Sequence, residues 1–235
     1  MGMNVAGNRA AQLSTGNYLN GWSEYTITSW IKSNIIDSDE GWFNTVLATD
    51  RRDRFAGLRY DRRGWLASNN TIDVLKFGIE VNGNETAIES REFAQTTTLQ
   101  HVVGRWRSGE APEIFIDNDD SNPTAVMAPQ TGTLTNQPGM VVGRGIQETG
   151  TTSFNGIIYD LRLYNVYLSN AELNAIYYGQ GSDDIYRGLQ YWYKTLDIPP
   201  GGVFSVLKDW SDSKLDLPAS NNPVGVENPI GYRRR

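Results

Sequence analysis

Two neighbouring stretches decide the fold: FNGIIYDLRLYN at 154–165 and LSNAEL at 168–173. The first stretch is rich in β-branched and aromatic residues, which predicts a β-strand. In the second stretch Ser169 precedes Glu172 by three residues. This is the spacing of a capping box, in which the two side chains satisfy free amides at the start of a helix. We therefore predict a strand that is followed directly by a short helix near residues 169–178.

The residues around the capping box support the same helix. Leu168 and Leu173 stand where a hydrophobic staple packs, just before and just inside the first turn. Ile176 and Tyr177 continue the apolar face of the helix. Gly179 is placed to adopt the left-handed conformation that ends many helices.

Outside this region, short alternating runs are separated by turn residues. The runs expected to form strands are 25–31, 43–49, 55–60, 64–68, 74–81, 99–107, 113–117, 140–144, 189–194 and 203–207. The Asn82-Gly83 pair is a strong hairpin signal, and the runs 55–60 with 64–68 and 99–107 with 113–117 are predicted to form hairpins. Many short strands with frequent turns predict an all-β sandwich or barrel rather than an alternating βαβ fold.

Composition limits the class of protein. The chain has 235 residues, a length at which a sandwich forms one domain. It has no cysteine, which excludes disulfides, and its one histidine, His101, disfavours a histidine-based zinc site. Because His101 alternates with Leu99 and Val103, we expect it to be half-buried with its hydrogen bonds satisfied. The net charge of −6 disfavours nucleic acid as a partner, and no apolar stretch is long enough to span a membrane.

The stretch at 154–173 resembles the last strand and the following helix of laminin G-like, concanavalin A-like domains, which read roughly F-x-G-x-I-D-E-V-R-I-Y-N and L-S-x-x-E-I. Three upstream runs are similar to other strands of that family, in the same order: 25–32, 98–105 and 113–118. The resemblance covers about residues 10–180. It implies an antiparallel jelly-roll β-sandwich of the concanavalin A-like kind.

The chain departs from the family pattern in two places. Leu99 and Gln100 stand where the family has a tryptophan, and DNDD at 117–120 replaces the usual Asp-Gly turn. In addition, GLQYW at 188–192 and DWSD at 209–212 resemble a segment that usually precedes the domain, and here they follow it. This order is either a permutation, since sandwich termini often lie close together, or a chance echo.

We expect the chain to be organised in three parts. Residues 1–180 form the jelly-roll sandwich, and 181–220 add strands that complete this domain or pack on it. Residues 221–235 contain breaks at proline and glycine and are expected to form an extended arm. We expect the arm to become ordered when the protein joins an assembly.

Some concanavalin A-like proteins are glycanases, so glycoside hydrolysis is the enzymatic function to test. That chemistry needs two carboxylates facing each other across a cleft. Glu113 and Asp117 have suitable parity on one strand, but Asp117 begins a turn, and Glu89 and Glu92 have opposite parity. The compact Glu-x-Asp-x-x-Glu arrangement of the related glycanases is absent. We therefore expect a protein that is not an enzyme.

Calcium is the cofactor that the resembled fold suggests, and its ligands are clustered oxygens. Two loops are dense in acidic residues, with Asp37 and Asp39 in one and Asp117 and Asp119 in the other. These four residues are the candidate Ca²⁺ ligands. The alternative is that both loops are solvated turns, because Asp and Asn bond to their own backbone in such turns.

Sugar binding would use exposed aromatic faces beside polar groups. Trp22, Trp42 and Trp65 flank loops and are the candidate ligand-binding residues. Trp30 and Trp106 lie within predicted strands and are expected in the core. Packing against the protein is the alternative role of the loop tryptophans.

Arginines are the candidate interface residues. A run of arginine and aspartate at 50–63 predicts either a patch for a neighbouring protein, since arginine is enriched at interfaces, or a solvated face with local ion pairs. The arginines predicted at an interface are Arg51, Arg52, Arg54, Arg62 and Arg63, together with Arg233, Arg234 and Arg235 in the arm.

Three classes of function compete: a structural or display protein of an assembly, a free carbohydrate-binding module, and an enzyme. Residues 1–15 lack a basic segment followed by an apolar core, so no signal peptide is expected. A laminin G-like domain without a leader or cysteines resembles the virion proteins of tailed bacteriophages. We therefore expect a capsid decoration or head-surface protein on the virion, with the capsid shell, copies of itself and cell-surface glycans as partners. The alternatives are a tail-associated or fibre-associated adhesin and an extracellular carbohydrate-binding module.

Overall fold

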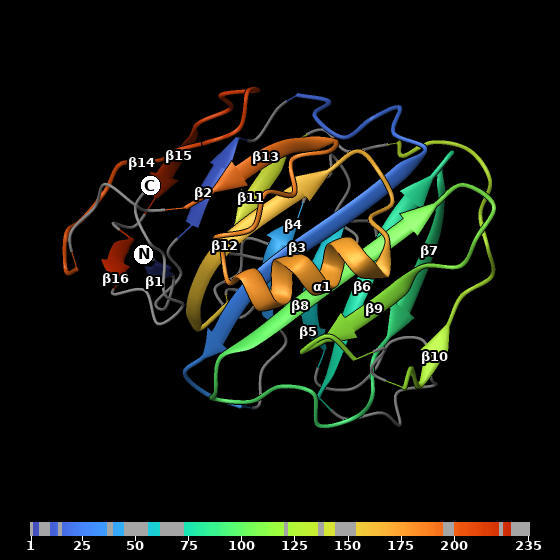
Figure 1. Ribbon diagram of the computed structural model, residues 1–235, viewed down its shortest axis with the longest axis horizontal. Coiled ribbons are helices and arrows are strands. Elements are labelled where there is room, and N and C mark those ends of the chain that lie inside the picture. The colour runs from blue at the N-terminus through green and yellow to red at the C-terminus, as the bar shows by residue number, and fades with distance from the viewer. Residues whose placement is uncertain are drawn as a thin grey trace.

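Two antiparallel β-sheets pack face to face in the computed structural model of the chain (Figure 1). The model describes residues 2–4, 10–13, 16–36, 40–44, 56–61, 73–119, 122–135, 139–143, 154–194, 200–220 and 223–226. Within these residues one sheet has 7 strands, the other has 9, and there is one α-helix. The predicted all-β antiparallel sandwich with a short helix is therefore confirmed.

The first sheet, sheet A, has the strand order β16-β1-β12-β3-β8-β9, and β13 also pairs with β12. Its strands are β1 (Gly2–Asn4), β3 (Glu24–Ser33), β8 (Gln100–Arg107), β9 (Glu113–Ile116), β12 (Gly156–Tyr164), β13 (Leu189–Tyr193) and β16 (Val224–Val226). The pairing of β8 with β9 confirms the hairpin that was predicted from these two runs.

The second sheet, sheet B, has the order β10-β7-β6-β5-β4-β11-β2-β15-β14. Its strands are β2 (Ala10–Leu13), β4 (Glu40–Asn44), β5 (Gly57–Asp61), β6 (Val74–Val81), β7 (Asn84–Glu89), β10 (Ala125–Val126), β11 (Met140–Val142), β14 (Val206–Leu207) and β15 (Leu217–Ser220). Asn82 and Gly83 form the predicted turn between β6 and β7. β5 lies between β4 and β6, and its predicted hairpin partner, 64–68, lies outside the described residues.

The core lies between the two sheets, where alternate residues of each strand meet. In β8, Val102 and Trp106 belong to this core, and Gly104 stands between them. The ring of Phe77 reaches Gly104 from β6 of the opposite sheet, since a Cβ placed on Gly104 would lie 2.3 Å from ring atom Cδ2. Glycine at this position therefore allows the two sheets to approach.

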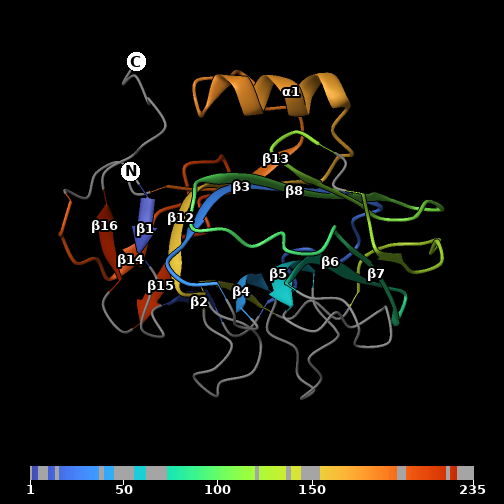
Figure 2. The same cartoon turned by 90° about the horizontal axis from the view of Figure 1, so that it is seen from below.

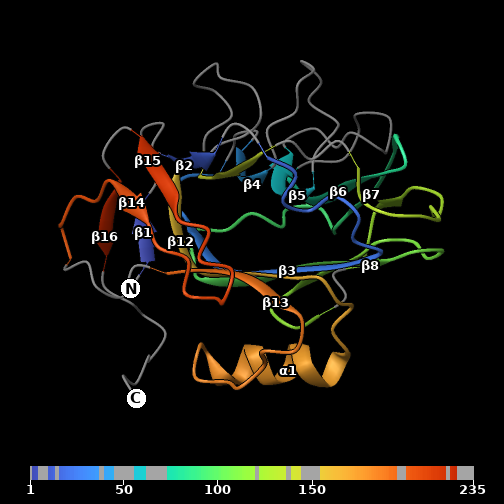
Figure 3. The ribbon, with the colours of Figure 1, turned by 90° about the horizontal axis from the view of Figure 1, so that it is seen from above.

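Helix α1 (Asn170–Gly179) lies on the outer face of sheet A, on the side away from sheet B (Figures 2 and 3). Leu168, Leu173 and Ile176 pack there against Val103 of β8 and Tyr164 of β12. The predicted hydrophobic staple therefore forms as part of a small second core. No helix in the described part of the chain is long and apolar enough to cross a membrane.

Both ends of α1 are capped. The Ser169 amide donates a hydrogen bond to Glu172 Oε2 at 2.7 Å, and the Glu172 amide donates to Ser169 Oγ at 3.3 Å, which confirms the capping box. The left-handed residue at the other end is Gln180, with φ of 46°, so the prediction that Gly179 would fill this role was wrong. Glycine at position 179 leaves room for the side chain of Asp183, because a Cβ on Gly179 would lie 2.8 Å from Cβ of Asp183.

Strand β12 has different neighbours along its two halves. β3 pairs along one side, while on the other side β1 pairs with Ile157 and Ile158 and β13 pairs from Leu161 to Tyr164. Asp160 lies between the two halves, at a shift in register, with φ of 48°. A non-glycine residue in this left-handed region is strained, so surrounding contacts must hold Asp160 there.

The C-terminal strands contribute to both sheets. β13 and β16 belong to sheet A, and β14 and β15 belong to sheet B (Figure 1). β16 pairs with β1, so Val224–Val226 of the predicted arm lies beside the N-terminal strand, and 227–235 lies outside the described residues. The strands after residue 180 thus continue the sheets that the earlier strands begin.

Candidate functional site

The outer face of β13 carries the candidate site. Tyr191 and Tyr193 are buried in the core between the sheets. Because side chains alternate along a strand, Trp192 and the following Lys194 project to the other face, which also carries α1. Two further aromatic residues flank this strand. We use the name β13 surface for Tyr186, Trp192, Lys194 and Trp210.

Trp210 lies along the free side of β13. Its amide donates to the Trp192 carbonyl at 2.8 Å, and its indole Nε1 donates to the Lys194 carbonyl at 3.1 Å. These two hydrogen bonds fix the indole beside the strand while 36% of the residue stays exposed. Trp210 is therefore a firmly held aromatic side chain that solvent can reach.

Tyr186 lies on the opposite side of β13 from Trp210. It follows Asp183, which is bonded to β12, and β12 is the neighbour of β13 on that side. The ring centroid of Tyr186 is 6.0 Å from that of Trp192, and 53% of Tyr186 is exposed. The β13 surface thus has two exposed aromatic residues with the more buried Trp192 between them.

The ammonium group of Lys194 lies between the two indoles. Nζ is 3.2 Å from the ring centroid of Trp192 and 5.4 Å from that of Trp210. Both distances are within the range of cation–π attraction. Only 9% of Lys194 is exposed, so its charge is held against the aromatic rings instead of projecting freely into water.

A buried ion network supports Trp192. Arg162 donates to both oxygens of Asp160, at 3.0 and 2.8 Å, and to both oxygens of Asp183, at 2.7 and 3.0 Å. The guanidinium carbon lies 4.7 Å from the Trp192 ring centroid. The Trp192 indole Nε1 donates to Asp160 Oδ1 at 2.5 Å. These contacts fix the orientation of the indole.

Arg162 keeps its charge although it is buried. Burial lowers the pKa of Arg162, but the Asp160 carboxylate, Tyr164 and the hydrogen bonds to Asp183 and Asp160 raise it more, and the net shift is upward. The guanidinium is therefore charged at every physiological pH. This matters because a buried carboxylate without its cation is strongly destabilising.

The GLQYW and DWSD stretches meet in the structure. The carboxylate of Asp209 accepts hydrogen bonds from the amides of Trp192, Ser211 and Leu215, each at 2.9 Å. The hydroxyl of Ser211 donates to the Gln190 carbonyl at 2.5 Å. The two stretches therefore form one structural unit, which ties Trp210 to β13.

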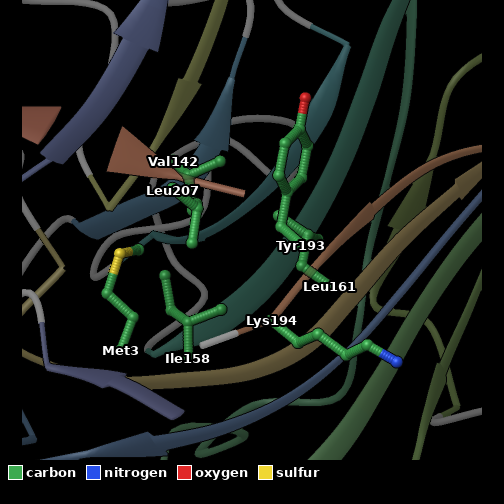
Figure 4. A pocket seen from close by; sticks show the side chains of 7 residues that line it. All are labelled: Met3, Val142, Ile158, Leu161, Tyr193, Lys194 and Leu207. Carbon is green, nitrogen blue, oxygen red and sulfur yellow. The ribbon is translucent and has the colours of Figure 1, made fainter. Parts of the chain in front are cut away.

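A small apolar hollow lies on the core side of β13 (Figure 4). It is lined by Met3, Val142, Ile158, Leu161, Tyr193, Lys194 and Leu207. Its volume is about 10 Å³, room for about one water molecule. The ammonium of Lys194 points away from it (Figure 4). The hollow is a packing gap and offers no room for a ligand of the size of a sugar.

The β13 surface has the chemistry of a binding site. Exposed aromatic faces pack on the apolar face of a sugar ring, and an ammonium group donates hydrogen bonds to hydroxyl oxygens. The carboxylates of Asp160 and Asp183, in the buried network beside Trp192, are both engaged by Arg162. They are buried on a common cation and are not placed as a general acid and a general base facing a substrate.

The tryptophans predicted to bind ligand do not lie at this surface. Trp22 is half-buried and packs against the core. Its ring stacks on that of Tyr191, with 6.1 Å between the ring centroids, and is tilted relative to that of Tyr25, with 5.9 Å between the centroids. Trp42 lies in β4, but its side chain is not among the described ones, and Trp65 lies outside the described residues. Ligand binding by Trp22, Trp42 and Trp65 stays a prediction.

The predicted calcium ligands are used in other ways where the structure describes them. Asp117 Oδ1 accepts a hydrogen bond from the His101 amide at 2.9 Å, and Asp119 pairs with Arg91 at 3.7 Å. The described residues contain no group of three or more His, Cys, Asp or Glu side chains that could hold a metal. Asp37 and Asp39 lie outside the described residues, and calcium binding there stays a prediction.

The predicted interface arginines cannot be placed on this surface. All of them lie outside the described residues: Arg51, Arg52, Arg54, Arg62, Arg63, Arg233, Arg234 and Arg235. Their role at an interface stays a prediction.

The carboxylates considered for hydrolysis are held by other groups. Glu113 accepts from Arg105 Nε at 2.5 Å and from the hydroxyl of Tyr167. Asp117 lies beyond the other end of β9, in a turn with φ of 54°, and bonds to backbone. The two side chains therefore do not form the facing pair that glycoside hydrolysis needs.

The environment of His101 differs from the prediction. The residue is only 1% exposed. The centroid of its ring lies 5.0 Å from that of Trp30 in β3 and 5.7 Å from that of Tyr177 in α1. Its Nε2 has no hydrogen-bond partner in the described structure. Burial lowers the pKa of His101 to about 4, while Asp160 opposes this shift. The expectation of a half-buried, satisfied histidine was wrong because α1 covers this face of the sheet.

The two packed antiparallel sheets define a lectin-like β-sandwich. The family model of the concanavalin A-like lectin/glucanases superfamily matches residues 6–174. The chain therefore belongs to this superfamily, as the resemblance in the sequence implied. Among curated proteins, none matches the chain by sequence.

Solved structures share the fold at low sequence identity. A candidate carbohydrate-binding protein from Bacteroides ovatus has a TM-score of 0.67 and 16% identity, with 98% of this chain and 61% of that chain covered. The present chain thus spans 61% of the length of that protein. The CBM40 domain of the Ruminococcus gnavus IT-sialidase, bound to α2,3-sialyllactose, has a TM-score of 0.50 and 14% identity, with 74% of this chain and 98% of that chain covered.

Sequence reasoning missed the β13 surface, although a signal for it was present. Trp192 and Trp210 lie within the two stretches that resembled a displaced family segment. The alternation through Tyr191, Trp192, Tyr193 and Lys194 marks a strand with aromatic side chains on both faces. Only one face of a strand can point between the two sheets, so the aromatic residue on the other face must lie outside the sandwich core.

Proposed function

We propose that the chain is a non-catalytic, glycan-binding module and that it binds carbohydrate at the β13 surface. The observation that carries the proposal is the pair of exposed aromatic residues, Tyr186 and Trp210, on either side of Trp192, with the Lys194 ammonium between the indoles. Aromatic faces with a few fixed polar groups are the elements of a sugar-binding site.

The rigid support of the site favours binding. Trp192 is held by Asp160 through its indole, and Trp210 is held by two hydrogen bonds to the backbone of β13. Pre-ordered side chains lose little conformational freedom on binding, so more of the contact energy contributes to affinity. The glycan-bound CBM40 domain has the same fold, which makes glycan recognition a sound function to test for this chain.

A glycan array probed with multivalent protein tests the proposal. We expect hits that are lost with Trp210→Ala and weakened about tenfold or more with Tyr186→Ala, since exposed aromatic contacts dominate such sites. Tyr178→Ala is the matched control, because Tyr178 is 75% exposed on α1 and does not belong to the β13 surface. Hits that persist in Trp210→Ala but vanish in Trp42→Ala or Trp65→Ala would place the site at the loops predicted from the sequence. No hits for the wild-type protein would leave a purely structural role.

Display on a virion is the finer function predicted from the sequence. Repeated copies on a particle would raise the apparent affinity of a weak glycan site through avidity, which makes the two roles compatible. We propose the virion surface as the setting in which to look for the protein. Mass spectrometry of purified particles would find it at many copies beside the capsid shell, and its absence from particles would reject this setting in favour of a free extracellular module.

A further inference from the structure

We infer that the β13 surface binds an oligosaccharide of about three units or more, laid across β13 from Trp210 to Tyr186. This inference rests on the proposed function, since it concerns the form of glycan that the same surface takes. It goes further because it assigns the two exposed rings to different units of one chain, which distinguishes oligosaccharides from single sugars.

The ring of Trp192, at the centre of the surface, is covered by other side chains. Lys194 Nζ lies 3.2 Å from the centroid of this ring, and the guanidinium carbon of Arg162 lies 4.7 Å from it. Trp192 is 8% exposed, whereas 53% of Tyr186 and 36% of Trp210 are exposed. Aromatic contact with a ligand is therefore available at two separate points, one on each side of a covered centre.

The two exposed rings are carried by the two neighbours of β13. The Trp210 amide donates to the Trp192 carbonyl at 2.8 Å, so Trp210 lies beside β13 on its free side. On the other side, the carbonyl of Ile185, the residue before Tyr186, accepts a hydrogen bond from the Tyr164 hydroxyl of β12 at 3.3 Å. Neighbouring strands lie about 4.8 Å apart, so these two backbone segments are separated by about 10 Å across β13. This separation is wider than one sugar ring.

A chain can use both rings, and a single sugar can use only one. An oligosaccharide places one unit on Tyr186, another on Trp210 and a linking unit over the covered centre. Once the first unit is bound, the second contact forms within the complex at a high effective concentration, so affinity rises with no new group on the protein. Two hydrogen bonds already hold Trp210 to β13, so little further ordering opposes this gain.

The dependence of affinity on chain length tests the inference. The probes are cello-, manno-, laminari- and malto-oligosaccharides, each as a series from the single sugar to the hexasaccharide, titrated by calorimetry. In a series that binds, we expect the affinity to rise at least about tenfold from one unit to about three units and then to level off, because longer chains reach no further ring.

Tyr186→Ala is the variant that separates the two contacts. It keeps the contact at Trp210 and removes the second one, so chains should bind no more tightly than single sugars. Tyr178→Ala is the matched control, because it removes an exposed tyrosine of α1 that lies outside the β13 surface, and it should keep the wild-type dependence on length. Thermal unfolding of both variants shows that they are folded before binding is compared.

The outcomes distinguish the inference from the proposed function. Single sugars that bind as tightly as chains, on the glycan array or in these series, and that depend on Trp210 would overturn the inference and keep the glycan-binding function. An advantage of chains that survives Tyr186→Ala would also overturn the inference, since the added units would then make their contacts elsewhere. If no glycan on the array or in these series binds in a way that depends on Trp210, the proposed function fails, and the inference fails with it.

Discussion

Asp160 is the residue on which the buried polar network converges. It has a left-handed backbone, with φ of 48°, at the point where β12 changes partners from β1 to β13. Its carboxylate binds Arg162 and accepts the indole N–H of Trp192. A strained residue persists when its surroundings hold it, and here the contacts that hold it also orient Trp192.

His101 makes the stability of the fold depend on pH. Burial lowers its pKa from 6.5 to about 4 in the folded state, while the unfolded chain keeps the ordinary value. The unfolded state therefore takes up the proton first as pH falls. Stability is full above the unfolded pKa and declines through the window from 6.5 to about 4. The predicted loss from this residue is roughly 3 kcal/mol in the free energy of unfolding.

Urea unfolding at several pH values checks this prediction, with His101→Gln as the comparison. The glutamine does not titrate, so its curve of unfolding free energy against pH should be flatter in that window. The pKa of Glu172 is lowered to about 2, chiefly by its hydrogen bond to Arg187. Its contribution to the free energy of unfolding is therefore lost only as pH falls from 4.5 towards about 2, mostly below the window of His101. If wild type and His101→Gln lose the same free energy of unfolding in that window, His101 is not the cause of the pH dependence.

At the scale of elements, α1 is held at its first turn. Ser169 caps the helix, and Glu172 returns a hydrogen bond to Ser169 and pairs with Arg187 at 2.8 Å. Because the cap satisfies amides that would otherwise be free, we expect Ser169→Ala to lower the free energy of unfolding by about 1 kcal/mol. Asn170→Ala, at an exposed position of the same turn, is the control and should have little effect. Chemical denaturation of the two variants measures the difference, and equal losses would argue against the capping box as the cause.

Strand β13 is the element that joins core to site. Tyr191 and Tyr193 on one face belong to the sandwich core, and Trp192 on the other face belongs to the β13 surface. The hydroxyls of the two tyrosines donate to the carbonyls of Tyr18 and Leu215, both at 3.1 Å. The exposed aromatic surface is thus fixed from behind by the packing of the same strand.

At the scale of the whole molecule, the spacing of the two sheets depends on Gly104. A Cβ at this position would lie 2.3 Å from the Phe77 ring, and both residues are within interior strands. We expect Gly104→Ala to cost about 1–3 kcal/mol through overpacking. In the Gly104→Ala background, Phe77→Leu removes part of the clash, so the two substitutions together should cost less than the sum of their separate effects. Thermal unfolding of the wild type, the two single variants and the double variant measures these losses of stability. Losses that simply add up would contradict the predicted clash.

The whole molecule also extends beyond the part that the family model matches. The match ends at residue 174, yet β13, β14, β15 and β16 follow it and pair into both sheets. Asp183, which pairs with the buried Arg162, also lies beyond the match. The segment after α1 therefore supplies edge strands, one half of a buried ion pair and most of the candidate site.

Local patterns accounted for the strand-and-helix motif. The alternation of 154–165 and the spacing of Ser169 and Glu172 predicted a strand and a capped helix, because both depend on residues close together in the chain. The same patterns failed at Gly179 and His101. The left-handed cap lies one residue later than predicted, at Gln180, in a turn where Gly179 packs closely against Asp183. The burial of His101 depends on the packing of α1, which is distant in the sequence, against β8.

The sequence by itself determined the all-β class, the family and the position of the helix, since periodicity and capping are local properties. Only the tertiary structure decided which aromatic residues face water. Trp22 flanks a predicted loop and Trp192 lies within a predicted strand, yet Trp22 packs on Tyr191, whereas Trp192 lies between Arg162 and Lys194 on the outer face. The physical reason is that β13 joins the sheet beside β12, and this pairing of distant segments sets which face of β13 is buried.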